Sequence, residues 1–334
     1  MNYIPIFICG KPGCSKTLSL ELLRASLNGE ESLDNLFKIV PALRVVYFQG
    51  SRTSTSKEIE NAFESAYKSI KKGYISLLFF DQIGLAEISD NNPLNILHSK
   101  LEYEDEAHKV SFVGVSNWSL DASKQNRGIF IARPDPSKFD LINTAKVISE
   151  SYEVNPLGTI NSIISDCYLE YKKILKIMIE NSNDNDKLDL SLVDFHGTRD
   201  FYNMIKQFAK KIKDVPKNNN KKIMEITKDC LDRNFSGLSF ADITNFRTVS
   251  DLFIEKTKEY NLPKYNLVNS IKNNIEDLES RYLILIANNE VGSYLIDNLF
   301  KENKDSKNIN SIFNTKPIYY YGSSFKNDLE KGIV

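Results

Sequence analysis

The sequence has few side chains that bind zinc or form disulfides. Its 334 residues include four cysteines and three histidines. No two cysteines are spaced as C-x-x-C, so neither a zinc site nor a disulfide framework is indicated. Two of the four, Cys9 and Cys14, flank a glycine turn described below. Free thiols at such a place suit a reducing compartment.

Long apolar runs and an excess of one charge are also missing. No apolar run approaches the roughly 20 residues that a membrane-spanning helix needs. The net charge is −1 at pH 7, which argues against nucleic acid as the main partner. The apolar start Tyr3–Cys9 lacks the basic leader of a secretory signal. We therefore expect a cytoplasmic globular protein of about two domains, with no membrane span.

A phosphate-binding motif follows the apolar start. It matches the pattern G-x-x-x-x-G-K-[ST], except that Ser15 stands where the second glycine is usual. Backbone N–H groups of such a turn, together with the positive end of the next helix, bind phosphate oxygens. The predicted nucleotide-binding residues are Gly10, Lys11, Pro12, Gly13, Cys14, Ser15, Lys16 and Thr17. The alternative is a chance glycine-rich turn.

Three residues of this turn have separate expected roles. Lys16 would reach the β- and γ-phosphates as a point charge, and the Thr17 hydroxyl would ligate Mg²⁺. Ser15 carries a Cβ and tolerates positive φ less well than glycine. We therefore expect a helical φ at Ser15, at the start of a helix Ser15–Leu23.

A second motif closes a fully apolar run, Tyr74–Gln82. An apolar run that ends in an acid is typical of a central parallel strand with a carboxylate beside Mg²⁺. Asp81 would orient Mg²⁺ through its water ligands. The alternative is an Asp that only caps a turn. After a further strand, Asn117 would lie at the carboxyl edge of the sheet and could position the attacking water.

Strands and helices alternate over residues 1–135. Thr55–Glu58 fits a capping box for one of the helices. The expected strands are Tyr3–Cys9, Arg44–Phe48, Tyr74–Gln82, Val110–Asn117 and Gly128–Ala132. This alternation predicts an α/β fold, a P-loop three-layer sandwich around a parallel sheet.

Helical spacing dominates after Pro136. Two polar linkers interrupt it, at 181–187 and 213–222, and the second is expected to be a disordered insertion. Between them Phe195–Tyr202 forms the turn into a helix that ends near Lys211. The expected later elements are a strand-like run Tyr282–Ala287, a helix Val291–Phe300, a strand Ile318–Tyr321 and a turn Gly322–Ser324. An α/β pattern thus restarts after the helical region.

Several strings of the sequence resemble one family. Gly10–Thr17 together with Asp81–Glu87 is similar to an AAA+ ATPase module. More narrowly, the string S-N-W-x-L-D…N-R-G-I-F over Ser116–Phe130 resembles the mysterin family of giant dynein-like AAA+ ubiquitin ligases with a RING finger. Gly197–Tyr202, Arg233–Phe235 and Arg281–Ala287 are similar to the downstream segments of that family. The resemblance covers most of the chain.

The resemblance implies roles for four polar residues. Asn117 would be the sensor-1 residue, and Arg199 the sensor-2 arginine of a helical lid, on the γ-phosphate. Arg127 would be an arginine finger offered to a neighbouring AAA+ module, in cis or in trans, with Arg133 the less favoured candidate. The alternative for each arginine is a surface ion pair. ATP and Mg²⁺ would be the ligands.

The resemblance also implies how the chain is divided. Residues 1–136 would be the nucleotide-binding subdomain, 137–280 the helical lid, and 281–334 the start of a following degenerate module. Because the first strand begins almost at Met1, we expect a fragment of a longer protein. The ubiquitin machinery would be a partner only through that parent protein. A RING finger needs several paired Cys and His ligands, which the four cysteines and three histidines do not supply.

One residue departs from the family pattern. The mysterin-type module has Asp-Glu where this chain has Asp81-Gln82. Such a glutamate polarises the attacking water, whereas Gln82 cannot accept a proton but can still hold a water by hydrogen bond. Losing a general base commonly removes ~10²–10⁴ in rate. We therefore predict that ATP binding is retained and that hydrolysis is slow or absent.

Three functions stay open at this point. The first is an AAA+ ATPase module, in which hydrolysis drives or gates a conformational change between modules. The second is a nucleotide-binding structural switch that has lost hydrolysis through Gln82. The third, a P-loop kinase or small GTPase, is disfavoured by the helical lid, by Asn117 and by the absence of an N-K-x-D guanine-reading stretch.

Overall fold

The computed structural model describes most of the chain, as two compact units. The first unit contains residues Met1–Lys213 and Phe240–Val249, and the second Asp214–Ser239 and Ser250–Val334. The described residues are 4–101, 110–155, 158–180, 192, 194–216, 218–238, 246–264, 266–277, 285 and 291–302. The linker expected at 181–187, the strand at 318–321 and the turn at 322–324 lie outside them, as does the strand at 282–287 except for Leu285.

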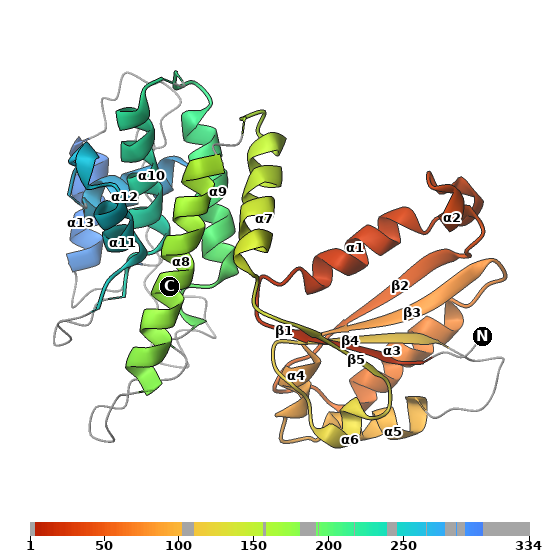
Figure 1. Ribbon diagram of the computed structural model, residues 1–334. Helices are drawn as coiled ribbons and strands as arrows, with labels where there is room; N and C mark the ends of the chain where they lie inside the picture. The colour runs from red at the N-terminus through yellow and green to blue at the C-terminus, as the bar shows by residue number, and fades with distance from the viewer. Residues whose placement is uncertain are drawn as a thin grey trace. The chain divides into compact units, whose positions relative to one another are not determined.

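A five-stranded parallel sheet organises the first unit (Figure 1). Its strands are β1 (Ile6–Gly10), β2 (Ala42–Gln49), β3 (Tyr74–Asp81), β4 (Ser111–Ser116) and β5 (Ile129–Arg133). Their order is β2-β3-β4-β1-β5, and every neighbouring pair is parallel. The first strand thus lies inside the sheet, with Ile6 paired to both Val113 and Ile129. The predicted α/β fold with a parallel sheet is confirmed.

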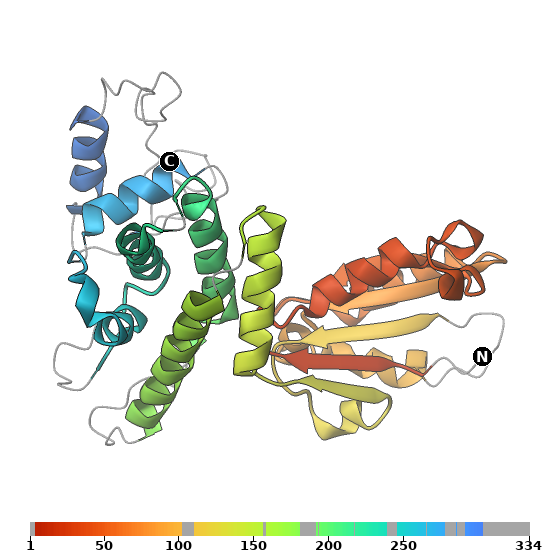
Figure 2. The same cartoon turned by 45° about the horizontal axis from the view of Figure 1, so that its top comes forward.

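Helices cover both faces of the sheet, because side chains alternate along each strand. Along β3, Leu78 and Phe80 pack in one core with Phe63 of α3. Leu77 and Phe79 pack in the other core with Leu20 of α1. The helices and short 3-10 turns of this part are α1 (Lys16–Ser26), η1 (Gly29–Glu31), α2 (Asn35–Lys38), α3 (Ser56–Lys68), α4 (Ile83–Glu87), η2 (Pro93–Asn95), α5 (Ile96–Leu101) and α6 (Ala122–Gln125). The sheet with a helical layer on each face is the expected three-layer sandwich (Figure 2).

Two local expectations from the sequence have opposite outcomes. The capping box before α3 is confirmed: Glu58 N donates to Thr55 Oγ1 at 3.4 Å, and Thr55 N donates to Glu58 Oε2 at 2.8 Å. The helical φ expected at Ser15 is wrong. Ser15 lies in the left-handed region, with φ 60° and ψ 25°, and α1 begins only at Lys16. The turn keeps the conformation that a glycine would adopt there.

Three helices complete the first unit: α7 (Lys138–Ser151), α8 (Gly158–Glu180) and α9 (Thr198–Ile212). Helix α7 packs against both α8 and α9. Helix α9 buries a face of large side chains, namely Phe201, Met204, Ile205, Phe208 and Ile212. The helix expected to end near Lys211 is therefore confirmed. These helices belong to the same unit as the sheet, and the predicted domain boundaries at 136 and 280 stay predictions.

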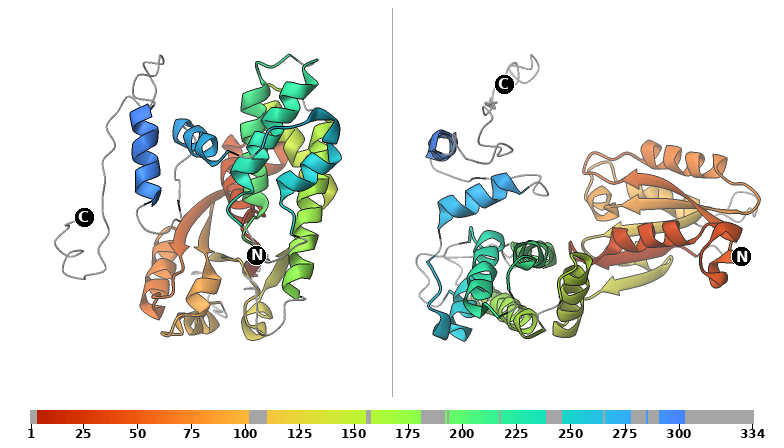
Figure 3. Two further views of the ribbon diagram at one scale, coloured as in Figure 1. Left: turned by 90° about the vertical axis from the view of Figure 1, so that its left-hand side faces the viewer. Right: turned by 90° about the horizontal axis from the view of Figure 1, so that it is seen from above.

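Helices are the regular elements among the described residues of the second unit (Figure 3). Its elements are α10 (Asn220–Asn234), α11 (Val249–Lys256), η6 (Lys258–Tyr260), α12 (Leu267–Glu276) and α13 (Val291–Glu302). A buried ion pair joins Lys228 to Asp232, whose other oxygen accepts a hydrogen bond from Ser250 at 2.6 Å. The insertion expected to be disordered over 213–222 is partly wrong. Helix α10 starts inside it, capped by the side chain of Asn219.

Candidate functional site

The phosphate-binding turn connects the end of β1 to α1, at the carboxyl edge of the sheet. A Cβ on Gly10 would lie 2.8 Å from Arg133 Cβ and 3.0 Å from Arg133 O, so only glycine lets β5 approach this closely. Gly13 has φ +93°, and Ser15 has φ 60°. A left-handed non-glycine residue costs roughly 1–2 kcal/mol, and such strain is often held at ligand sites.

Lys16 is folded over this turn. Lys16 is only 8% exposed, and its Nζ donates to Gly10 O at 2.5 Å and to Lys11 O at 2.9 Å. A third bond reaches Asn117 Oδ1 at 3.1 Å. Burial lowers the pKa of Lys16. An ammonium that is poor in water contacts and held by neutral oxygens is a strong binding group for an anion.

A cavity of about 370 Å³ opens beside this ammonium. The residues that line it come from the turn, α1, the ends of β3 and β4, and α9. They are Pro12, Gly13, Ser15, Lys16, Thr17, Leu18, Asp81, Gln82, Asn117, Arg199 and Tyr202. Most of the residues predicted from separate parts of the sequence thus surround one space. Of the predicted site residues, Gly10, Lys11, Cys14 and Arg127 do not line it.

The end of β2 fixes the turn that carries Asp81 and Gln82. Gly50 N donates to Asp81 O at 2.8 Å, and a Cβ on Gly50 would lie 2.6 Å from Gln82 O. Asp81 Oδ1 accepts from Gln82 N at 2.9 Å. Gln82 is left-handed, with φ 53°, at the start of α4. Backbone contacts therefore fix the main chain of Asp81 and Gln82 and one oxygen of the Asp81 carboxylate.

The two strings that carry the family resemblance contact each other. Glu87 at the end of α4 accepts from Asp121 N at 2.9 Å and from Lys124 Nζ at 3.0 Å. A Cβ on Gly84 would lie 2.5 Å from Ser116 Oγ and 2.8 Å from Trp118 Cε2. These contacts hold α4 against the loop that presents Asn117. The two strings thus pack against each other in the fold.

The two predicted finger arginines lie in different surroundings. Arg127 follows α6, and its Nε and Nη1 are buried within the first unit. Arg133 ends β5 and is exposed. The assignment of Arg127 as a finger stays a prediction.

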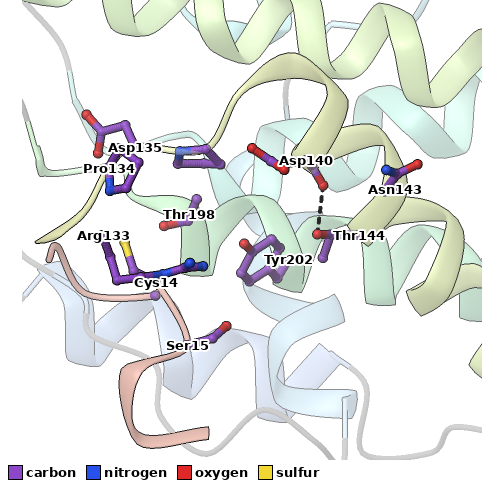
Figure 4. A pocket seen from close by; sticks show the side chains of 12 residues that line it. Cys14, Ser15, Arg133, Pro134, Asp135, Asp140, Asn143, Thr144, Thr198 and Tyr202 are labelled. Carbon is purple, nitrogen blue, oxygen red and sulfur yellow. Dashed lines mark hydrogen bonds between the residues drawn. The ribbon is translucent and has the colours of Figure 1, made fainter. Parts of the chain in front are cut away.

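A second cavity, of about 310 Å³, shares Gly13, Ser15 and Tyr202 with the first (Figure 4). It is lined by Gly13, Cys14, Ser15, Arg133, Pro134, Asp135, Pro136, Asp140, Asn143, Thr144, Thr198 and Tyr202. Tyr202 lines both cavities, and burial raises its pKa. Sequence reasoning did not single out Thr198 or Tyr202. Their spacing around Arg199 was the available signal, because residues four apart share a helix face.

The start of α9 rests directly on the turn. Thr198 Oγ1 donates to Pro12 O at 3.3 Å. A Cβ on Gly13 would lie 2.7 Å from Thr198 Oγ1 and 3.2 Å from Arg199 N. The same helix then presents Arg199 and Tyr202 to the cavities. Gly13 is thus required both by its φ and by this close approach.

Thr17 and Asp81 are the available ligands for a magnesium ion. Mg²⁺ usually keeps several waters and takes one or two protein groups together with phosphate oxygens, so this oxygen pair fits it. Within the described ranges, no group of three or more His, Cys, Asp and Glu side chains could hold a metal by itself. Within the same ranges, no helix is long and apolar enough to cross a membrane.

The fold and the cavity together define a P-loop nucleotide-binding module of the AAA+ class. A family model described as the RNF213 AAA domain matches residues 1–140. The chain is 32% identical over 347 residues to E3 ubiquitin-protein ligase rnf213-beta of Danio rerio, and 30% identical over 345 residues to RNF213 of Homo sapiens. Each alignment covers 98% of the chain and 6% of the relative. The chain therefore belongs to the mysterin (RNF213) family, as the resemblance implied.

The relatives are much longer than this chain, which spans 6% of their length. Their ligase activity is a property of those whole proteins. Among solved structures, a RuvB variant of Thermotoga maritima is similar with a TM-score of 0.44 and 13% identity. That similarity covers 69% of this chain and 62% of the RuvB chain.

Proposed function

We propose that the module binds ATP with Mg²⁺ and that its occupancy gates a conformational change between neighbouring AAA+ modules. The observation that carries this proposal is the single cavity that collects Lys16, Thr17, Asp81, Asn117 and Arg199. Lys16 would exchange its carbonyl partners for the β- and γ-phosphate oxygens. Arg199 would add a second cation from α9.

Hydrolysis is proposed to be slow. Magnesium neutralises charge that develops on the phosphates, but it does not take a proton from the attacking water. Gln82 lines the cavity where a general base would be needed, and an amide can orient a water without accepting its proton. Asn117 is also an amide. The chain therefore resembles a nucleotide-loaded switch more than a fast motor.

The wider setting is part of the same proposal. A neighbouring AAA+ module would complete the nucleotide site of this chain. Arg127 or Arg133 of this chain would act as the arginine finger in the site of another neighbouring module. The ubiquitin machinery would be reached through the longer parent protein, in the cytoplasm. Neither nucleic acid nor a membrane is proposed as a partner.

Turnover of the purified chain and of Gln82→Glu tests the proposal. We expect the wild type to bind Mg-ATP with little turnover, and Gln82→Glu to gain ~10²–10⁴ in rate because a carboxylate can act as the base. Lys16→Ala is the binding control and should weaken ATP affinity by about 10- to 100-fold. A competition series with GTP tests the preference for the base.

Each outcome separates the hypotheses. Rapid turnover by the wild type would make the module a working ATPase and overturn the slow-hydrolysis proposal. Equal rates for wild type and Gln82→Glu would mean that another group activates the water. Failure of the wild type to bind any nucleotide would reject the proposed function as a whole.

A further inference from the structure

One residue of the phosphate-binding turn points away from the cavity. Lys11 Nζ lies 3.1 Å from Asp135 Oδ2 and 3.1 Å from Asp194 Oδ1. Asp135 follows β5, and Asp194 lies just before α9. Burial lowers the pKa of Lys11, but hydrogen bonds to these two carboxylates more than offset it and raise the pKa above the usual value. Its ammonium therefore joins the turn to two other segments of the first unit.

Asp194 is shared with a second lysine. Lys172 Nζ on α8 lies 3.4 Å from Asp194 Oδ1 and donates to His196 O at 3.2 Å. Burial lowers the pKa of Lys172, and the nearby Asp194 carboxylate opposes this shift. Asp194 thus links Lys11 of the turn to α8, immediately before the residues that start α9.

The main chain of Lys11 is tied to the other lysine of the turn. Lys11 O accepts one of the three hydrogen bonds of Lys16 Nζ, at 2.9 Å. Because an ammonium has only three donors, a phosphate that binds Lys16 Nζ must displace at least one of its three partners, and Lys11 O is one of them. Loss of the hydrogen bond to Lys11 O would free the main chain of Lys11 to move, while its side chain stays bound to Asp135 and Asp194.

We propose that Lys11 is a positioning residue that couples occupancy of the phosphate site to the start of α9, through its ion pairs with Asp135 and Asp194. This inference rests on the proposed nucleotide binding. The start of α9 carries Thr198, which contacts Pro12, and Arg199, which reaches the cavity. Coupling is reciprocal, so an ordered α9 would also favour the nucleotide-bound turn.

The two ion pairs are suited to signalling rather than to holding the fold together. Their side chains are 41% exposed for Lys11, 64% for Asp135 and 48% for Asp194. Pairs this exposed add little to stability, so a variant that lacks them should still fold. Their effect should be visible only in a measurement that compares the nucleotide-bound and nucleotide-free protein.

Hydrogen exchange of the full chain, with and without saturating Mg-ATP, tests the coupling. In the wild type we expect ATP to slow exchange in the first two turns of α9 by ~10-fold. In Lys11→Met, also measured at saturation, the slowing should fall to less than ~3-fold. Lys11→Arg keeps the charge and should restore it. Saturating each variant makes the comparison independent of its affinity.

Lys138→Met is the matched control. Lys138 pairs with Asp166 at 2.8 Å, with both side chains similarly exposed at 45% and 41%, and neither residue lies in the turn. This variant should keep the full effect of ATP on α9. Full ATP-dependent slowing in Lys11→Met, or an equal loss in Lys138→Met, would overturn the coupling while the proposed function stands. A wild type that binds no ATP would reject both.

Discussion

At the scale of single residues, Ser15 shows how the site uses strained backbone. A serine at φ 60° replaces the glycine that this turn usually contains, and the helix starts one residue later. Ser15 nevertheless lines the cavity together with Gly13, Lys16 and Thr17. Gln82, which lines the same cavity, has the same left-handed conformation.

Ser15→Gly should leave stability unchanged or raise it by up to about 1 kcal/mol. Glycine relieves the left-handed strain but loses more backbone entropy on folding, so the two effects partly cancel. Thermal unfolding measures the change. Ser65→Gly, in the middle of the exposed face of α3, is the control and should lower stability by about 0.5 kcal/mol. If Ser15→Gly destabilised the chain more than Ser65→Gly, the strain argument would be incorrect.

As the pH rises, nucleotide affinity should begin to fall at a lower pH than it would if Lys16 had the pKa of an ordinary lysine. Burial lowers the pKa of Lys16, so its ammonium is lost at lower pH, and phosphate binding must restore the proton. Calorimetry in two buffers of different ionisation enthalpy should detect proton uptake on ATP binding between about pH 8 and 10. Lys16→Arg stays charged and should show no uptake. Binding without uptake in the wild type would count against a depressed pKa.

At the scale of elements, helix α1 is stabilised by the one face that packs against the sheet. Leu20 is 4% exposed and packs with Leu77, Phe79 and Val115, whereas Leu22, two residues on, is 59% exposed. Leu20→Ala should cost about 2–5 kcal/mol, because it opens a cavity in the core between α1 and the sheet. Leu22→Ala should change stability by less than about 0.5 kcal/mol. Denaturant unfolding measures the free energy of unfolding of both variants. Equal losses would contradict the packing of Leu20, and not Leu22, against the sheet.

The elements also show what could be predicted from the sequence. The strands that carry Asp81 and Asn117 were predictable because a buried parallel strand is apolar on both faces and ends in a polar residue at the edge of the sheet. The contact of Thr198 with the turn and the place of Tyr202 in the cavity wall were not, because they bring together residues far apart in the sequence. No local pattern encodes such a pairing.

The disordered insertion expected over 213–222 was partly wrong for a different reason. Its composition, rich in lysine and asparagine, is typical of disorder. Asn219, however, caps the first turn of α10, and Ile223 on the same helix is buried. Composition describes the average solvation of a segment, whereas a single cap and one apolar face are enough to start a helix.

At the scale of the whole molecule, the two units have separate cores and should unfold separately. Lys228 and Asp232 are buried together in the second unit, with side chains 3% and 10% exposed. Lys228→Ala leaves a buried carboxylate without its cation, which should cost about 3–5 kcal/mol. Calorimetry should show a lowered transition for the second unit, while ATP still raises the transition of the first. A uniform fall of a single transition would mean that the units unfold as one.

The position of β1 in the sheet has a consequence for folding during synthesis on the ribosome. Of the five strands of this sheet β1 is made first, yet both of its neighbours, β4 and β5, are made after β2 and β3. A nascent chain that stops before β4 has no partner for β1 and exposes an unpaired apolar strand. The capacity to bind nucleotide should therefore appear only after β5 has emerged, late in translation of this part. Until then the unpaired β1 is an expected binding site for chaperones.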